Sequence, residues 1–251
     1  MPTAYSTLCR CFVGEYSVKA EGCAVLKYHT VISGRFLERP NRFIARVETA
    51  EGVQTVHVKN TGRCRELLVP GAVVYLEEHR EPNRKTPYDL IAVEKGNRLI
   101  NMDAQAPNKV FAEWAASGKF LPDITAIRCE YVYGDSRLDF CLETEKGPHL
   151  VEVKGVTLEE NGHARFPDAP TERGVKHILE LQKAVENGLD ATLFFVVQIK
   201  NIDSVSPNDV THPAFGAALR RAVSNGVSVC AYDCSVTPDS LAIRRPVPVI
   251  L

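Results

Sequence analysis

The chain has 251 residues, of which 45% are hydrophobic and 24% charged, an ordinary balance for one large or two modest hydrophobic cores. It contains no run of 18 apolar residues, which excludes a membrane-spanning helix. The mixed, acid-containing first 30 residues do not resemble a secretory signal. We therefore expect a soluble, cytoplasmic protein that does not act in a membrane.

The formal net charge of −1 is unevenly distributed. Residues 1–100 carry 15 Lys and Arg against 11 Asp and Glu, a balance of +4, whereas residues 101–251 carry 15 against 20, a balance of −5. A basic surface for a polyanion beside a cluster of carboxylates would produce this asymmetry. Chance explains it equally well, so the asymmetry alone decides nothing.

Short strand-like runs separated by turns fill residues 30 to 95. The segment 43–58 has two alternating apolar runs around Glu51-Gly52, which is typical of a β-hairpin, and residues 72–79 and 88–100 supply further strands. This succession predicts either a small β-barrel, of which the oligonucleotide-binding (OB) barrel is a common form, or an open sheet.

The pattern changes after Asp103 and predicts helices and strands in the order α-β-β-β-α-β-α-β. The predicted elements are 108–117, 124–133, 136–143, 148–156, 171–187, 191–199, 211–225 and 227–232. Short connectors make the first three strands an antiparallel meander, and the continuous apolar run 191–199 is suited to a central strand buried on both faces. We expect an α/β domain with a mixed sheet.

The meander contains the sharpest functional signal. Glu152 and Lys154 are two residues apart on one strand, so they share a face, and pairing across the preceding turn would bring Asp139 near Glu152. Two carboxylates can hold Mg²⁺ or Mn²⁺, and an ammonium group beside them suits phosphodiester cleavage. Glu130 on the preceding strand is either a third carboxylate ligand or a solvated acid. The competing interpretation of Glu152 and Lys154 is an exposed charge pair.

Basic residues in two segments predict a nucleic-acid interface. Residues 35–65 hold seven Lys and Arg against three Glu, interleaved with Phe36 and Phe43, for which we favour core positions. The bases that follow the predicted cap residue Thr171 lie in the first turns of a helix, where the helix dipole does not favour cations, so an anionic ligand and ordinary solvated surface explain them equally well. The candidates from these two segments are Arg35, Arg39, Arg42, Lys59, Asn60, Arg63, Arg173, Lys176 and His177.

The arrangement of Asp139, Glu152 and Lys154 resembles the PD-(D/E)xK nuclease superfamily over residues 107–232. Further blocks are similar to the sugar fermentation stimulation protein A family of bacteria and archaea over residues 27–245. Those blocks are Gly34–Phe36 with Pro40–Phe43, His57–Arg63, Arg84–Thr86, Ser136–Phe140, Glu152–Leu158 and Phe166–Thr171 with Arg173-Gly174 and Lys176-His177.

The second resemblance implies an OB-like barrel over residues 27–103 and a nuclease-like α/β domain with a mixed sheet over 104–251, after an extension, 1–26, that is unstructured or not part of the protein. It implies a DNA-binding protein linked to the expression of sugar (maltose) utilisation genes, and it adds Arg84 and Lys85 to the nucleic-acid candidates. The alternative function is an active Mg²⁺-dependent endonuclease or exonuclease on a structured DNA or RNA, and a third is a scaffold that no longer cuts. DNA is the expected partner, with RNA and a homodimer left open.

Overall fold

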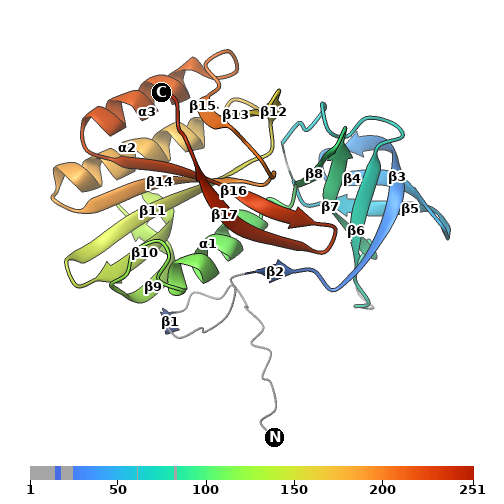
Figure 1. Ribbon diagram of the computed structural model, residues 1–251, viewed down its shortest axis with the longest axis horizontal. Coiled ribbons are helices and arrows are strands. Elements are labelled where there is room, and N and C mark those ends of the chain that lie inside the picture. The colour runs from blue at the N-terminus through green and yellow to red at the C-terminus, as the bar shows by residue number, and fades with distance from the viewer. Residues whose placement is uncertain (1–14, 18–24, 61, 82–83) are drawn as a thin grey trace, which may run out of the picture.

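The structure is a computed structural model that describes residues 15–17, 25–60, 62–81 and 84–251. Two lobes lie side by side: a barrel of strands from the first part of the chain and a larger α/β lobe from the second part (Figure 1). A single buried apolar cluster includes residues of both lobes, among them Met102 and Ile199. The predicted fold class, an OB-like barrel followed by an α/β domain with a mixed sheet, is confirmed.

The first lobe is a closed barrel. Its strands are β3 (Thr30–Asn41), β4 (Ile44–Thr49), β5 (Gly52–Val58), β6 (Val73–Glu78), β7 (Tyr88–Lys95) and β8 (Arg98–Asn101). The long β3 pairs with β6 through its first half and with β4 through its second half. Parallel pairing of β5 with β7 closes the ring, which settles the choice between barrel and open sheet.

Gly34 allows β3 to bend between its two partners. A Cβ atom at this position would lie 2.5 Å from Val47 Cγ1 and 2.8 Å from the carbonyl oxygen of Glu48. Both contacts are closer than van der Waals packing permits, so only glycine lets β3 approach β4 here.

The second lobe is a sheet covered by helices on both faces (Figure 1). The elements are α1 (Ala106–Ala116), β9 (Ile124–Tyr133), β10 (Ser136–Thr144), β11 (Gly147–Val156), α2 (Glu172–Glu186), β14 (Asp190–Val197), α3 (Pro213–Ser224) and β16 (Ser228–Thr237). Strands β9, β10 and β11 form the predicted antiparallel meander, and β11, β14 and β16 are parallel. Side chains of β14 alternate between two cores: Leu193 and Phe195 pack in the α2–α3 core, and Phe194 and Val196 in the α1 core. The prediction of a central strand buried on both faces is confirmed.

The predicted element order omits several strands. The structure adds β12 (Glu159–Glu160), β13 (His163–Phe166) and β15 (Ser204–Pro207) as a small sheet, and β17 (Ser240–Val247) pairs with β16 beyond the strand predicted to be last. β12, β13 and β15 are too short to show a period, and the Arg244-Arg245-Pro246 run in β17 lacks apolar alternation.

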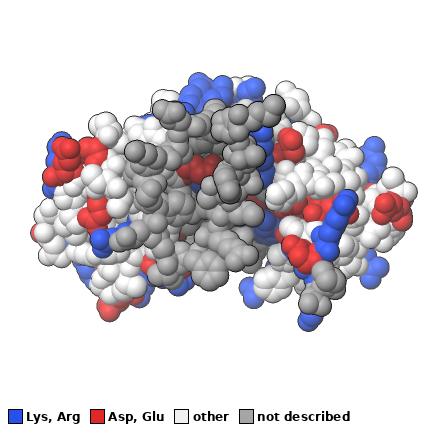
Figure 2. All heavy atoms as spheres, turned by 90° about the horizontal axis from the view of Figure 1, so that it is seen from below, with Lys and Arg blue, Asp and Glu red and all other residues white. Residues whose placement is uncertain are grey.

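The prediction of an extension at residues 1–26 falls mainly outside the described residues. Within them, β1 (Glu15–Ser17) pairs with β9, and β2 (Leu26–Lys27) pairs with β17. No helix among the described residues is both long and apolar enough to cross a bilayer. On the face seen in Figure 2, acidic and basic side chains are mixed on both lobes rather than divided between them.

The two lobes meet through polar contacts as well as the shared core. Gln198 Nε2 donates to Asn101 Oδ1 at 2.8 Å and to the carbonyl oxygen of Asp103 at 3.0 Å, and all three residues are buried. Glu159 lies 3.3 Å from Lys95 Nζ and 3.5 Å from Arg98 Nε. Satisfied buried bonds of this kind fix the orientation of the barrel relative to the sheet.

Candidate functional site

Strands β10 and β11 separate at a pair of acidic residues. The ladder between them ends at Phe140–Val151, and carboxylates then take the place of main-chain partners. The Val153 amide donates to Asp139 Oδ2 at 2.8 Å, and the Asp139 amide donates to Glu152 Oε2 at 3.3 Å. The structure therefore brings together the two acids that the sequence places on neighbouring strands.

Glu152 is buried, with 1% of its surface exposed, and is bonded on two sides. Its Oε1 accepts from Lys154 Nζ and from His177 Nδ1. His177 lies in the first turns of α2, and its Nε2 accepts from Arg173 Nε at 3.3 Å. These contacts arise because Glu152 and Lys154, two apart on β11, both face α2. Sequence reasoning placed His177 at the nucleic-acid surface, whereas it is buried against Glu152.

Burial and mutual repulsion set the protonation of the two acids. Burial, together with the nearby Glu152 charge, raises the pKa of Asp139 to about 6, although Lys154, the Val153 amide and the Asn108 side chain act in the opposite direction. Burial also acts to raise the pKa of Glu152, but the bonds from His177 and Lys154 outweigh it and hold that pKa below its ordinary value. Asp139 therefore carries the less compensated charge, which a cation would relieve.

Glu130 lies apart from this pair. It is exposed on β9 with a left-handed φ of 53°, and its carboxylate is 3.4 Å from Arg137 Nη1. Within the described part of the chain, Glu130, Asp139 and Glu152 do not form a compact three-ligand group. A third ligand role for Glu130 is not supported by this arrangement.

A basic cavity of about 330 Å³ opens on the barrel. The described residues that line it include four arginines and no acid; they are Arg39, Asn41, Arg42, Gly62, Arg63, Cys64, Arg65 and Leu68. Beside it the Arg42 guanidinium lies 4.8 Å from the centre of the Phe43 ring. The sequence prediction that Phe36 and Phe43 are core residues is confirmed for Phe36 and wrong for Phe43. Phe43 lies in the turn between β3 and β4, and 45% of its surface is exposed. An exposed ring with a neighbouring cation is a platform for a base.

Arg39 stabilises the backbone beside this cavity. Its two Nη atoms donate to the carbonyl oxygens of Arg42, Asn60, Gly62 and Arg63 at 2.6–3.0 Å. These hydrogen bonds hold the Arg39 guanidinium against the backbone. The side chains of Arg42 and Arg63, in contrast, are exposed. Sequence reasoning did not select Arg65, which lines the same cavity.

The remaining predicted bases have different surroundings. Lys59 and Arg84 pair with buried acids inside the barrel, and Asn60 donates to the carbonyl oxygen of Met102 at 3.0 Å. The others are at the surface and comprise Arg35, Lys85, Arg173 and Lys176. Of these, Arg35 donates to the carbonyl oxygen of Gly71 and Lys176 to that of Asp135.

A second cavity of about 330 Å³ lies between the lobes. It shares Gly62 with the basic cavity, and its lining includes Gly155, the residue after Lys154, and Thr171, whose side chain caps α2. A Cβ atom at Gly62 would lie 2.5 Å from Asp168 Oδ2, so the barrel loop and the segment before α2 approach closely. The two cavities therefore adjoin at Gly62, and the second also reaches Gly155, the residue after Lys154.

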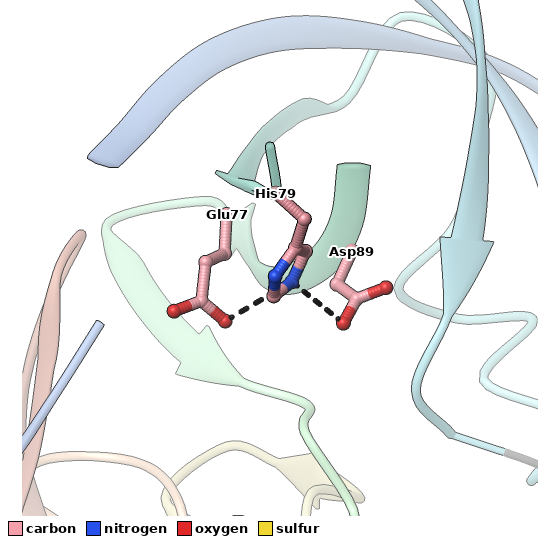
Figure 3. Close-up of side chains that lie close together, drawn as sticks. All are labelled: Glu77, His79 and Asp89. Atoms are coloured by element: carbon pink, nitrogen blue, oxygen red, sulfur yellow. Dashed lines mark hydrogen bonds and ion pairs between the residues drawn. The ribbon is translucent and has the colours of Figure 1, made fainter. Parts of the chain in front are cut away.

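A third feature is a partly buried cluster of Glu77, His79 and Asp89 on the barrel (Figure 3). Sequence reasoning missed it, and it also missed Asn108, whose Nδ2 donates to Asp139 Oδ1 at 2.8 Å. The only sequence signal for the cluster is the spacing of Glu77 and His79, two residues apart, which would put both on one face of an extended segment.

An OB barrel joined to a mixed α/β sheet with helices on both faces defines a two-domain class of protein. The chain belongs to the sugar fermentation stimulation protein family. The model for the "SfsA N-terminal OB domain" matches residues 37–102, and the model for the "Sugar fermentation stimulation protein RE domain" matches residues 105–240.

Relatives of similar length support this assignment. A sugar fermentation stimulation protein homolog of Clostridium beijerinckii is 50% identical over 226 residues, which are 90% of this chain and 100% of that protein. A homolog of Desulfitobacterium hafniense is 55% identical over 86% of this chain and 94% of its own. The solved structure of Pyrococcus furiosus SfsA in complex with Ca²⁺ is 28% identical, with a TM-score of 0.82 over 90% of this chain and 98% of that one.

Proposed function

We propose that the protein binds DNA and hydrolyses its phosphodiester bonds with a divalent cation held by Asp139 and Glu152. The observation that carries this proposal is the opening between β10 and β11, where both carboxylates and Lys154 gather. Oxygen ligands from two carboxylates suit Mg²⁺ or Mn²⁺. The Ca²⁺ complex of the Pyrococcus furiosus relative supports a divalent cation, since Ca²⁺ also takes oxygen ligands.

Each residue of the site has a distinct part in this proposal. A cation bound there would polarise the phosphate and lower the pKa of a water molecule. Lys154, whose side chain is 15% exposed, orients the water or offsets charge on the phosphate oxygens. His177 and Arg173 fix the orientation of Glu152 through consecutive hydrogen bonds.

The two cavities that share Gly62 offer a path for the nucleic acid. Exposed Arg42, Arg63 and Arg65 would contact phosphates, and Phe43 would stack on a base. The strand would then enter the cleft between the lobes beside Gly155. Arg173 and Lys176 on the exposed side of α2 are in a position to extend this contact.

A second candidate function is DNA binding in which the cation supports affinity without cleavage. The contacts of Lys154 and His177 with Glu152 favour it, because they already offset part of the charge that a catalytic cation would offset. Under either function, the name of the relatives supports a link to sugar fermentation, and regulation of sugar (maltose) utilisation genes is the corresponding role in the cell.

The cation site is tested by calorimetric titration of chelator-treated protein with Mn²⁺. We expect Asp139→Asn and Glu152→Gln each to weaken Mn²⁺ binding at least tenfold while DNA binding in chelator is retained. Glu130→Gln, which removes an exposed acid of the same sheet, is the matched control and should leave Mn²⁺ affinity unchanged. Equal Mn²⁺ affinity in all four proteins would refute the site.

A further inference from the structure

We propose that the barrel holds a second metal site, selective for a Zn²⁺-like divalent ion, formed by Glu77, His79 and Asp89. The pairing register of β6 and β7 brings these residues together. Glu77 on β6 lies directly opposite Asp89 on β7, and His79 follows just beyond the end of β6 with its ring between the two acids. One ligand atom from each lies within 4.8 Å of the other two.

The three side chains converge through specific atoms (Figure 3). His79 Nε2 lies 3.0 Å from Asp89 Oδ2 and 3.5 Å from Glu77 Oε2. Ligands at about 2.0–2.2 Å from a tetrahedral Zn²⁺ are separated from one another by similar distances. Only small side-chain movements would therefore bring all three atoms onto one ion.

In both acids, the carboxylate oxygen that points away from His79 has its own partners in the protein. Asp89 Oδ1 accepts from Arg84 and lies 3.2 Å from His57 Nδ1. Glu77 Oε1 accepts from the His29 amide at 3.1 Å. The oxygens that remain, Oδ2 of Asp89 and Oε2 of Glu77, are those that face the imidazole. Groups that orient ligands in this way are usual around metal sites.

His79 is also oriented as a ligand. Its Nε2 faces the two carboxylates, whereas its Nδ1 lies on the side of Glu81, 3.8 Å from Oε2. Only 16% of its side chain is exposed, so an ion there would be shielded from water.

The charge balance of the region favours a divalent ion. Three buried carboxylates, those of Glu77, Asp89 and Asp103, face two permanent cations, Lys59 and Arg84, so with neutral imidazoles the buried group has one excess negative charge. Lys59 Nζ is 2.9 Å from Asp103 but 3.8 Å from Asp89 Oδ2, so it compensates mainly the former. Buried charge needs a partner, which is either a metal ion or protonated histidines.

The ligand set points to Zn²⁺ rather than to Mg²⁺ or Ca²⁺. Zn²⁺ binds both imidazole nitrogen and carboxylate oxygen, whereas Mg²⁺ and Ca²⁺ prefer oxygen alone. The site is therefore distinct in chemistry from the all-oxygen pair Asp139 and Glu152.

The test is a titration of the chelator-treated Asp139→Asn protein with Co²⁺, a spectroscopic substitute for Zn²⁺, followed by displacement with Zn²⁺. We expect one Co²⁺ per chain, visible absorption bands of a nitrogen–oxygen site, and no thiolate charge-transfer band. Adding His79→Asn, or Glu77→Gln, should lower Co²⁺ affinity at least tenfold. His163→Asn, at an exposed histidine of the other lobe, is the control.

Every other outcome contradicts the site. A thiolate band would assign the ion to cysteines, and binding that persists unchanged in both cluster variants would assign it elsewhere. Folded protein that binds no Co²⁺ would mean that protonated histidines alone balance the acids. Displacement of Co²⁺ by Ca²⁺ as readily as by Zn²⁺ would exclude the nitrogen ligand. Circular dichroism checks folding, and if His79→Asn does not fold, Glu77→Gln decides.

Discussion

Asp139 and Glu152 are neighbouring buried acids whose charges are compensated unequally. Glu152 accepts hydrogen bonds from Lys154 and His177, whereas the donors to Asp139 among the described residues are neutral, the Val153 amide and Asn108. Groups with pKa values that differ in this way are typical of reactive sites. We therefore expect stability, protonation and the proposed cation binding to be coupled at Asp139.

Replacing Asp139 with Asn should stabilise the cation-free protein at neutral pH. Because the folded pKa of about 6 exceeds the unfolded value, the stability contributed by protonated Asp139 is full below pH 4 and is lost as pH rises through 6. A pKa shift of about two units corresponds to about 3 kcal/mol of destabilisation by the charged form. Asn accepts fewer hydrogen bonds than the carboxylate, and this loss offsets part of the gain. We therefore expect Asp139→Asn to raise the free energy of unfolding by about 1–2 kcal/mol at pH 7.

Urea unfolding at pH 4 and pH 7 in chelator measures this effect. The advantage of the variant should be present at pH 7 and disappear at pH 4. A variant that is less stable than wild type at both pH values would show that Asp139 is not the uncompensated acid.

His177 should control the pH at which Glu152 becomes available to a cation. In His177→Ala, burial of Glu152 is no longer offset by the imidazole, so the pKa of Glu152 rises and Mn²⁺ binding requires a higher pH. Calorimetry across pH 5–8 checks this shift. The adjacent exposed Lys176→Ala is the control. Identical pH profiles of Mn²⁺ binding for both variants would show that His177 does not set the pKa of Glu152.

At the scale of single elements, the backbone at Asn60, Gly62 and Arg63 depends on Arg39, whereas the exposed arginines beside it are available to a ligand. Arg39→Ala should lower the melting temperature because four carbonyl oxygens lose their donor. Arg63→Ala should leave the melting temperature unchanged, weaken DNA binding, and reduce the salt slope of log affinity by about one.

Exposed Arg46 on the same barrel, paired only with Glu38 among the contacts described for it, is the matched control for both variants. Fluorescence anisotropy at several salt concentrations gives the slope. An unchanged salt slope in Arg63→Ala, or a loss of DNA affinity no larger than that in Arg46→Ala, would show that DNA does not contact Arg63.

Elements with a clear period could be predicted from the sequence, and those with non-local determinants could not. The meander and the two-faced β14 follow from apolar alternation and from a continuous apolar run. β3 contains Gly34 and Pro40, which normally interrupt strands, and its curvature depends on two different partners. Closure of the barrel rests on the β5–β7 pairing, which no local pattern encodes.

The candidate site divides in the same way. The spacing of Glu152 and Lys154 and the short turn before them predict their contact with Asp139. The places of His177, Arg39 and Lys59 could not be predicted, since each is fixed by a segment distant in sequence. Residue type suggested phosphate contacts for all three, whereas the fold gives each a protein partner.

For the whole molecule, the two lobes form one body, and the nucleic-acid path that we propose runs between them. The shared core and the buried bonds of Gln198 hold the barrel against the sheet, so the exposed arginines keep a fixed position relative to the acidic pair. Fixed placement of a binding surface and a reactive site favours cleavage at a defined distance from the contacted phosphates.

The most direct test of this account is cleavage of labelled DNA by purified protein with Mn²⁺ and with chelator. Single-stranded, duplex and flap DNAs and an RNA are compared, and Lys154→Ala is measured beside Lys146→Ala, an exposed lysine in the preceding turn. We expect chelator-sensitive cleavage that falls by about 10²–10³ in Lys154→Ala and is unchanged in Lys146→Ala. Tight binding without cleavage of any substrate, or equal cleavage by both variants, would contradict it.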